Sequence, residues 1–125
     1  MSEKIPIFEE SSVPQEKDPN ELRRVLDRSI EYGTTEELMS LFENGMDINQ
    51  VDFQDRTALQ MMSFKGKKDV VEKLISMGAN INHVFMFQDR IPMTALDAAQ
   101  QASRTEIVSI LLHHGAKTGK EMMSN

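Results

Sequence analysis

The feature that most constrains this chain is that its sequence repeats every 33 to 37 residues. An offset of 33 residues aligns five identical pairs: Gly33 with Gly66, Leu41 with Leu74, Gly45 with Gly78, Ile48 with Ile81 and Asn49 with Asn82. An offset of 37 relates the second unit to a third: Leu59 with Leu96, Leu74 with Leu111 and Gly78-Ala79 with Gly115-Ala116. A period of this length is typical of solenoids, in which each unit buries its apolar face against the next.

The first unit has the hydrophobic period of two helices. Asp18-Pro19-Asn20-Glu21 has the form of a helix start, with an Asp N-cap, a Pro at the first helical position and a Glu that can bond back to the cap. Apolar residues then recur at helical spacing until Gly33: Leu22, Val25, Leu26 and Ile30. A second helix begins near Thr34 or Thr35, presents Leu38, Leu41 and Phe42, and ends at Gly45. Each unit is therefore predicted to be helix, tight turn, helix.

The third unit differs from the second by a longer connecting loop. FQDRTAL begins at Phe53, and the related string FQDRIPMTAL begins at Phe87. The four extra residues all fall between Asn82 and Thr94; one precedes the second FQDR and the others are Ile91-Pro92-Met93. The helices thus keep their register while the loop gains apolar residues.

At these residues the chain resembles the ankyrin-repeat family, whose unit of about 33 residues carries a Thr-Pro-Leu-His-x-Ala signature and pairs a β-turn with two antiparallel helices. The signature appears as Thr57-Ala58-Leu59-Gln60 and as Thr94-Ala95-Leu96-Asp97-Ala98-Ala99, departing at its Pro and His. The match is stronger in LISMGANIN (residues 74–82), with shorter echoes in LFENGMDIN and LLHHGA. The resemblance covers residues 18–116 and implies an all-α fold: an ankyrin-repeat solenoid of three stacked helix pairs with short β-turn fingers, the second finger lengthened.

The repeat boundaries are expected at residues 18–49, 50–82 and 83–116. Residues 1–17 contain two prolines, a Ser pair and no sustained period, so we expect a flexible N-terminal tail. Residues 117–125 are too short for another helix pair and are expected to form a C-terminal tail. Either Met122 and Met123 fold back over the last helix, or the chain is an excerpt from a longer one.

Several repeated residues have a predicted structural role. Stacking should align two ladders of buried leucines: Leu26, Leu59 and Leu96 in the first helices, and Leu41, Leu74 and Leu111 in the second. Gly45, Gly78 and Gly115 are placed to close the second helices in the left-handed conformation. Thr57 and Thr94 are expected to cap first helices, Ser103 replaces a turn glycine, and Asp52, Asp55 and Asp89 are expected to bond local backbone N–H groups.

Composition argues against several classes of function. A net charge of −6 disfavours non-specific binding to nucleic acid or an anionic membrane. The chain has no cysteine, so it has neither disulfides nor thiolate metal sites. We expect a monomer in the cytoplasm or also in the nucleus, with no membrane span.

No catalytic, metal or cofactor site is expected. His83 lies in a predicted turn, and His113 and His114 are adjacent, point in different directions and lack a third ligand at metal spacing. HGAKTGKE fails as a phosphate-binding loop, because His114 and Glu121 occupy the positions that require Gly and Ser or Thr. The chain is therefore predicted not to be an enzyme.

The ankyrin resemblance implies that a partner protein meets the concave side, formed by the fingers and the exposed edge of the first helices. Position by position, it selects Phe53, Gln54 and Arg56 on one finger with Phe64 and Lys65 on the adjoining helix, and Phe85, Met86, Phe87, Gln88 and Arg90 on the next finger with Gln101 on its helix. Phe85 and Phe87 either anchor a partner or fold inward against the inserted residues.

The function implied by the resemblance is a non-catalytic interaction module or adaptor. Two alternatives stay open: a regulatory subunit that inhibits or targets an enzyme, and the recognition module of a larger protein. A separate prediction concerns Ile5, Ile7 and Phe8, which with the acids that follow resemble a short SUMO-interacting motif.

Overall fold

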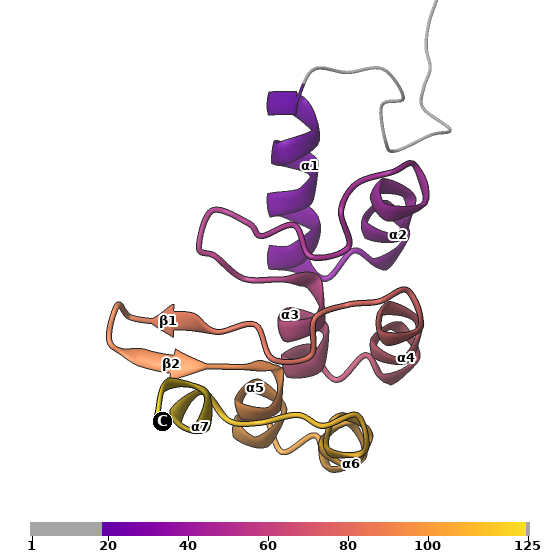
Figure 1. Cartoon of the computed structure of the whole chain (residues 1–125). Helices are drawn as coiled ribbons and strands as arrows, with labels where there is room; N and C mark the ends of the chain where they lie inside the picture. The colour runs from indigo at the N-terminus through magenta and orange to yellow at the C-terminus, as the bar shows by residue number, and fades with distance from the viewer. Residues whose placement is uncertain (1–18, 125) are drawn as a thin grey trace, which may run out of the picture.

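The computed structural model describes residues 19–124, in which three helix pairs stack in sequence order (Figure 1). The pairs are α1 (Pro19–Tyr32) with α2 (Thr35–Glu43), α3 (Ala58–Lys65) with α4 (Lys68–Ser76), and α5 (Ala95–Gln101) with α6 (Thr105–His113). Helices α1, α3 and α5 form an inner row, with α2, α4 and α6 on one side and the connecting fingers on the other. The predicted ankyrin solenoid is confirmed.

Helix α1 begins at Pro19, the first helical position predicted. The Asp18 cap and the tail proposed for residues 1–17 lie outside the described residues. Within residues 19–124, no helix combines the length and the apolar character needed to cross a lipid bilayer.

Both predicted leucine ladders lie in the core. Leu26, Leu59 and Leu96 of the inner helices and Leu41, Leu74 and Leu111 of the outer helices are all buried in one hydrophobic cluster. The cluster continues through the three units because each helix pair covers the apolar face of its neighbour.

The turn inside each helix pair passes through a left-handed residue. Gly33 and Gly66 provide it in the first two units, with φ of 68° and 78°, but in the third unit Ser103 takes φ of 59°. A Cβ crowds the following carbonyl in this conformation, so the third turn carries strain that the first two lack. A Cβ at Gly66 would also lie 2.7 Å from Cζ of Arg104, so that side chain would have to shift. The predicted closures at Gly45, Gly78 and Gly115 also have positive φ.

Thr57 and Gln60 form a capping box at the start of α3, as predicted for Thr57. At the start of α5 the hydroxyl of Thr94 instead donates to the carbonyl of Lys117 at 2.6 Å, and the side chain of Asp97 closes the cap. Gln60 Oε1 accepts the N–H of Thr57 at 2.8 Å, and Asp97 Oδ2 accepts the N–H of Thr94 at 2.8 Å. Gln60 and Asp97 stand where the family signature has His. Each also reaches onward: Gln60 Nε2 donates to the carbonyl of His83 at 2.6 Å, and Asp97 accepts the N–H of Gly119 at 2.6 Å. Gln60 and Asp97 therefore each form a hydrogen bond to a later segment of the chain, although neither is the His of the signature.

The second finger forms a β-hairpin. Strand β1 (Phe85–Phe87) pairs antiparallel with β2 (Ile91–Met93), which is the insertion itself. Gln88 and Asp89 have φ of 54° and 60°, and the N–H of Arg90 donates to the carbonyl of Phe87 at 3.1 Å. Two successive residues of positive φ match the right-handed twist of the strands, which is why such turns are favoured in hairpins. Figure 1 shows the hairpin extending away from the inner helices.

A short helix at the C-terminal end, α7 (Gly119–Met123), was not predicted. Thr118 and Glu121 form its capping box, and the helix packs against β2. At Gly119 a Cβ would overlap the carbonyl oxygen of Pro92, so this contact depends on glycine. Met122 and Met123 remain exposed rather than covering α6. The segment predicted as a tail therefore contains a docked helical turn.

Candidate protein-interaction surface

The first finger (residues 50–57) is closed by a buried carboxylate. Asp52 Oδ1 accepts the backbone N–H of Gln54 and of Arg56, both at 2.9 Å. This confirms the predicted role of Asp52. Asp55 has φ of 66°, close to the 60° of Asp89 in the second finger. Since Asp tolerates the left-handed region better than most residues, each FQDR string can form the tip of a finger.

Arg56 ties the first finger to α1. Its guanidinium lies 2.8 Å from Asp52 Oδ2 and 2.8 Å from Glu31 Oε1, and its side chain is only 12% exposed. The hydrogen bond and the charge of Arg56 lower the pKa of Glu31. Burial opposes the charged form of Arg56, but the bonds from Glu31 and Asp52 outweigh it and raise the pKa of Arg56. The positive charge of Arg56, a residue predicted to contact a partner, is therefore already paired with carboxylates of the same chain.

The two fingers and the inner helices α3 and α5 enclose a groove of about 400 Å³, which we call the finger groove. The second finger comprises residues 83–94. Eight of the eleven residues predicted to bind a partner line the finger groove: Gln54, Arg56, Phe64, Phe85, Met86, Phe87, Gln88 and Gln101. The structure therefore brings together side chains from α3, α5 and both fingers that are separated by up to 47 residues, the interval from Gln54 to Gln101.

The other three predicted residues do not line the finger groove. Phe53 is exposed at the tip of the first finger, where its N–H donates to Asp27 Oδ1 at 3.1 Å. Lys65 runs along the turn of the first unit, where its Cδ would lie 2.9 Å from a Cβ placed on Gly33. Arg90 is exposed at the hairpin turn. Their role in binding a partner remains a prediction.

Phe85 and Phe87 differ in burial because they lie at different distances from the helices along the hairpin. The pair Phe85–Met93 lies at the base, beside the helices, and both side chains are buried. The pair Phe87–Ile91 lies nearer the tip, where Phe87 is 39% exposed. Phe85 therefore folds inward as the floor of the finger groove, whereas Phe87 presents aromatic surface to solvent.

Four lining residues were not among the predicted contacts: Gln60, Met61, Met93 and Ala98. Two of them could have been found from the repeat. Met61 precedes Phe64 by three residues, which places both on one face of α3. The offset of 37 residues carries this pair onto Ala98 and Gln101 of α5. Met93 belongs to the insertion that the sequence had assigned to the finger.

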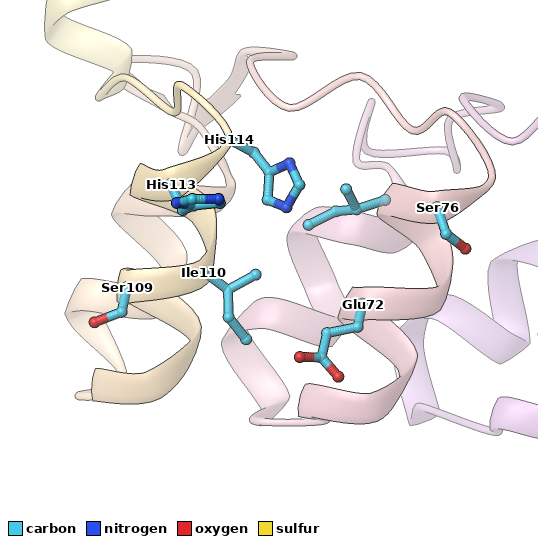
Figure 2. A pocket seen from close by; sticks show the side chains of 7 residues that line it. Glu72, Ser76, Ser109, Ile110, His113 and His114 are labelled. Carbon is cyan, nitrogen blue, oxygen red and sulfur yellow. The ribbon is translucent and has the colours of Figure 1, made fainter.

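A second groove lies on the outer side of the stack, between α4 and α6, with a volume of about 500 Å³. Figure 2 shows Ile110 and His114 pointing into the gap toward α4, with Glu72 facing them. The rings of His113 and His114 meet edge to face at 5.4 Å. Within residues 19–124, no three His, Cys, Asp or Glu side chains are grouped as metal ligands would be.

The remaining histidine has a structural contact. His83 Nε2 lies 3.0 Å from the carbonyl oxygen of Asp55, which joins the base of the second finger to the tip of the first. The segment with Ile5, Ile7 and Phe8 lies outside the described residues.

Comparison with known proteins agrees with this architecture. The model of the family described as ankyrin repeats (3 copies) matches residues 26–122. Serine/threonine-protein kinase 12 of Arabidopsis thaliana is 33% identical over 121 residues, an alignment covering 92% of this chain and 25% of the kinase. The chain thus spans about a quarter of the length of that relative. Ankyrin repeats are generally protein–protein interaction modules and are typically non-catalytic. The stacked helix pairs, the fingers and the family match together show that the chain belongs to the ankyrin-repeat family.

Proposed function

We propose that this chain is a non-catalytic adaptor that holds a partner protein in the finger groove. The observation that carries the proposal is the convergence of Phe64, Met86 and Phe87 on one groove from two separate segments of the chain. All three side chains remain substantially exposed. Aromatic residues and methionine are enriched at protein interfaces, and aromatic anchors contribute a large share of binding energy.

The finger groove is also preorganised. Phe64 lies on α3, in the centre of the stack, and Phe87 lies on a hairpin that is braced by α7 through β2. Because the side chains are held by packed elements, a partner has little ordering cost to offset on binding. Covering this apolar surface contributes roughly 25 cal/mol for each Å² removed from water.

Site-specific photo-crosslinking tests this proposal. The photoreactive residue p-benzoylphenylalanine replaces Phe64 or Phe87 in the finger groove, and Tyr32 or Leu112 as exposed control positions elsewhere. We expect positions 64 and 87 to crosslink the same protein in extracts of the native cell, and positions 32 and 112 to leave it uncrosslinked. Equal crosslinking from the control positions would remove the finger groove as the binding surface.

A second candidate function is supported by the kinase relative. The chain aligns with only a quarter of that protein, so the repeats would serve as the recognition module of a larger protein or as a regulatory subunit of an enzyme. The intact mass of the native protein distinguishes the first case, since a module of a larger chain would exceed 14.2 kDa. A change in the activity of a co-purified enzyme when the chain is removed would support the second; unchanged activity would contradict it.

A further inference from the structure

The finger groove offers no free charge to a partner. Among residues 19–124, Arg56 is its only charged lining residue, and its guanidinium is already paired at 2.8 Å with both Asp52 and Glu31. A partner carboxylate would have to compete with these two acids. A partner ammonium group would meet no carboxylate on the lining. A charged group entering the finger groove would therefore lose hydration without meeting an unpaired counter-ion on the lining.

The finger groove does offer free amides. Gln54, Gln88 and Gln101 line it, and within residues 19–124 their side chains have no hydrogen-bond partner. Each amide carries both donors and an acceptor, so it can bond either the N–H or the C=O of a passing backbone. The fourth lining glutamine, Gln60, is committed to Thr57 and His83.

The apolar lining favours a large apolar side chain of the partner without selecting one particular shape. Met61, Met86 and Met93 line the finger groove together with the buried Phe85, and methionine adapts its shape to irregular partners. The repeat also leaves room on the α5 side, because Ala98 and Gln101 occupy the positions that Met61 and Phe64 hold on α3. A volume of about 400 Å³ lies within the range of about 300–1,000 Å³ that is usual for ligand sites.

We infer that the finger groove takes an extended, uncharged peptide segment of the partner, with one large apolar side chain as its anchor. The anchor rests over Phe85 between the surfaces of Phe64 and Phe87, and the free glutamine amides bond the backbone on either side of it. This inference rests on the proposed function, because it names the partner chemistry of that same surface.

Methyl NMR on the chain labelled with ¹³C at its methionine methyl groups tests the inference. The probes are the Nα-acetyl amides of phenylalanine and leucine, compared with those of glutamate and lysine. Met61, Met86 and Met93 report on the finger groove, while Met39 and Met46 of the first unit serve as internal controls. We expect the phenylalanine and leucine probes to shift the NMR signals of the three groove methyl groups until the shifts saturate. The charged probes should bind at least about tenfold more weakly.

Equal shifts from the charged probes, or shifts of the control methyls as large as those in the groove, would overturn the inference. Phe64→Gln and Phe87→Gln should each weaken the response to the apolar probes, while Tyr32→Gln, at an exposed site elsewhere, should leave it unchanged. Unshifted methyl signals outside the groove confirm that a variant is folded.

The two proposals fail in different ways. If charged and apolar probes bind alike but positions 64 and 87 still crosslink a partner, only the inferred partner chemistry is wrong. If the apolar probes bind the finger groove but crosslinks form from positions 32 and 112 instead, the proposed function is wrong and only the groove's preference for apolar, uncharged groups stands.

Discussion

Asn82 of the second unit bonds through both ends of its amide to the end of the third unit and the residue that follows it. Its Oδ1 accepts the N–H of Lys117 at 2.8 Å, and its Nδ2 donates to the carbonyl of Gly115 at 3.3 Å. The equivalent Asn49 accepts the N–H of Asn80 at 2.7 Å. The repeated asparagine therefore makes a repeated hydrogen bond between units.

Asn82→Ala should destabilise the fold by about 1–2 kcal/mol, because it removes two hydrogen bonds that hold successive units together. The midpoint of urea unfolding measures the loss. Asn44→Ala is the matched control, since within the described part of the chain the side-chain amide of Asn44 bonds only to the carbonyl of Ser40 in α2, the helix that Asn44 caps. Equal unfolding midpoints for the two variants would show that the hydrogen bonds between units stabilise the fold no more than the local bond of Asn44 does.

Ser103→Gly should stabilise the fold by about 0.5–1 kcal/mol. The substitution relieves the left-handed strain at φ of 59°, although glycine gains freedom in the unfolded chain. Calorimetry should show a higher melting temperature for Ser103→Gly. Ser109→Gly, within α6, is the control and should lower the melting temperature, because glycine disfavours the helix interior. A lower melting temperature for Ser103→Gly would mean that the turn is not strained.

Gly119→Ala should release α7 from β2, although alanine favours helix, because its Cβ would overlap the carbonyl oxygen of Pro92. Hydrogen exchange of the amides in residues 118–123 should become faster, while exchange in α3 and α4 stays unchanged. Lys120→Ala, at an exposed site on the same helix, is the control. Protected amides in the Gly119→Ala variant would contradict the packing seen here.

The bond between Glu31 and Arg56 should give a pH-dependent contribution to stability. The pKa of Glu31 is lowered from its ordinary 4.5, so the stabilisation is fully present above about pH 4.5 and is lost as pH falls through the lower folded-state pKa. Glu31→Gln should cost at most about 1 kcal/mol near pH 7, because Glu31 is half exposed. The difference from the wild type, followed by urea unfolding, should shrink in acid. A stability difference between Glu31→Gln and the wild type that grew below pH 4.5 would contradict the expected direction of the pH dependence.

The repeated features of this fold were predictable because each is set by local sequence at a fixed spacing. The leucine ladders, the glycine turns and the Thr57 cap follow from helix periodicity and backbone sterics alone. The finger groove was also largely predictable, since equivalent positions of stacked units lie on the same side. Met61 and Ala98 could have been added by the same argument.

The features that were missed depend on tertiary contacts. A five-residue helix such as α7 is unstable in isolation, so its presence depends on packing against β2 and on the bond from Asp97 to Gly119. The different burial of Phe85 and Phe87 depends on how far each lies from the helices along the hairpin. The pairing of Arg56 with Glu31 crosses 25 residues and has no local sequence signal.

Affinity capture from extracts of the native cell tests the central claim most directly. It compares the wild type with Phe64→Ala/Phe87→Ala and with the control Tyr32→Ala/Leu112→Ala; Phe85 is left intact because alanine at this buried site would open a cavity. We expect the groove variant, with an unchanged unfolding midpoint, to lose about tenfold or more of the partner signal while the control retains it. Capture of the same proteins in the same amounts by the groove variant would contradict this expectation.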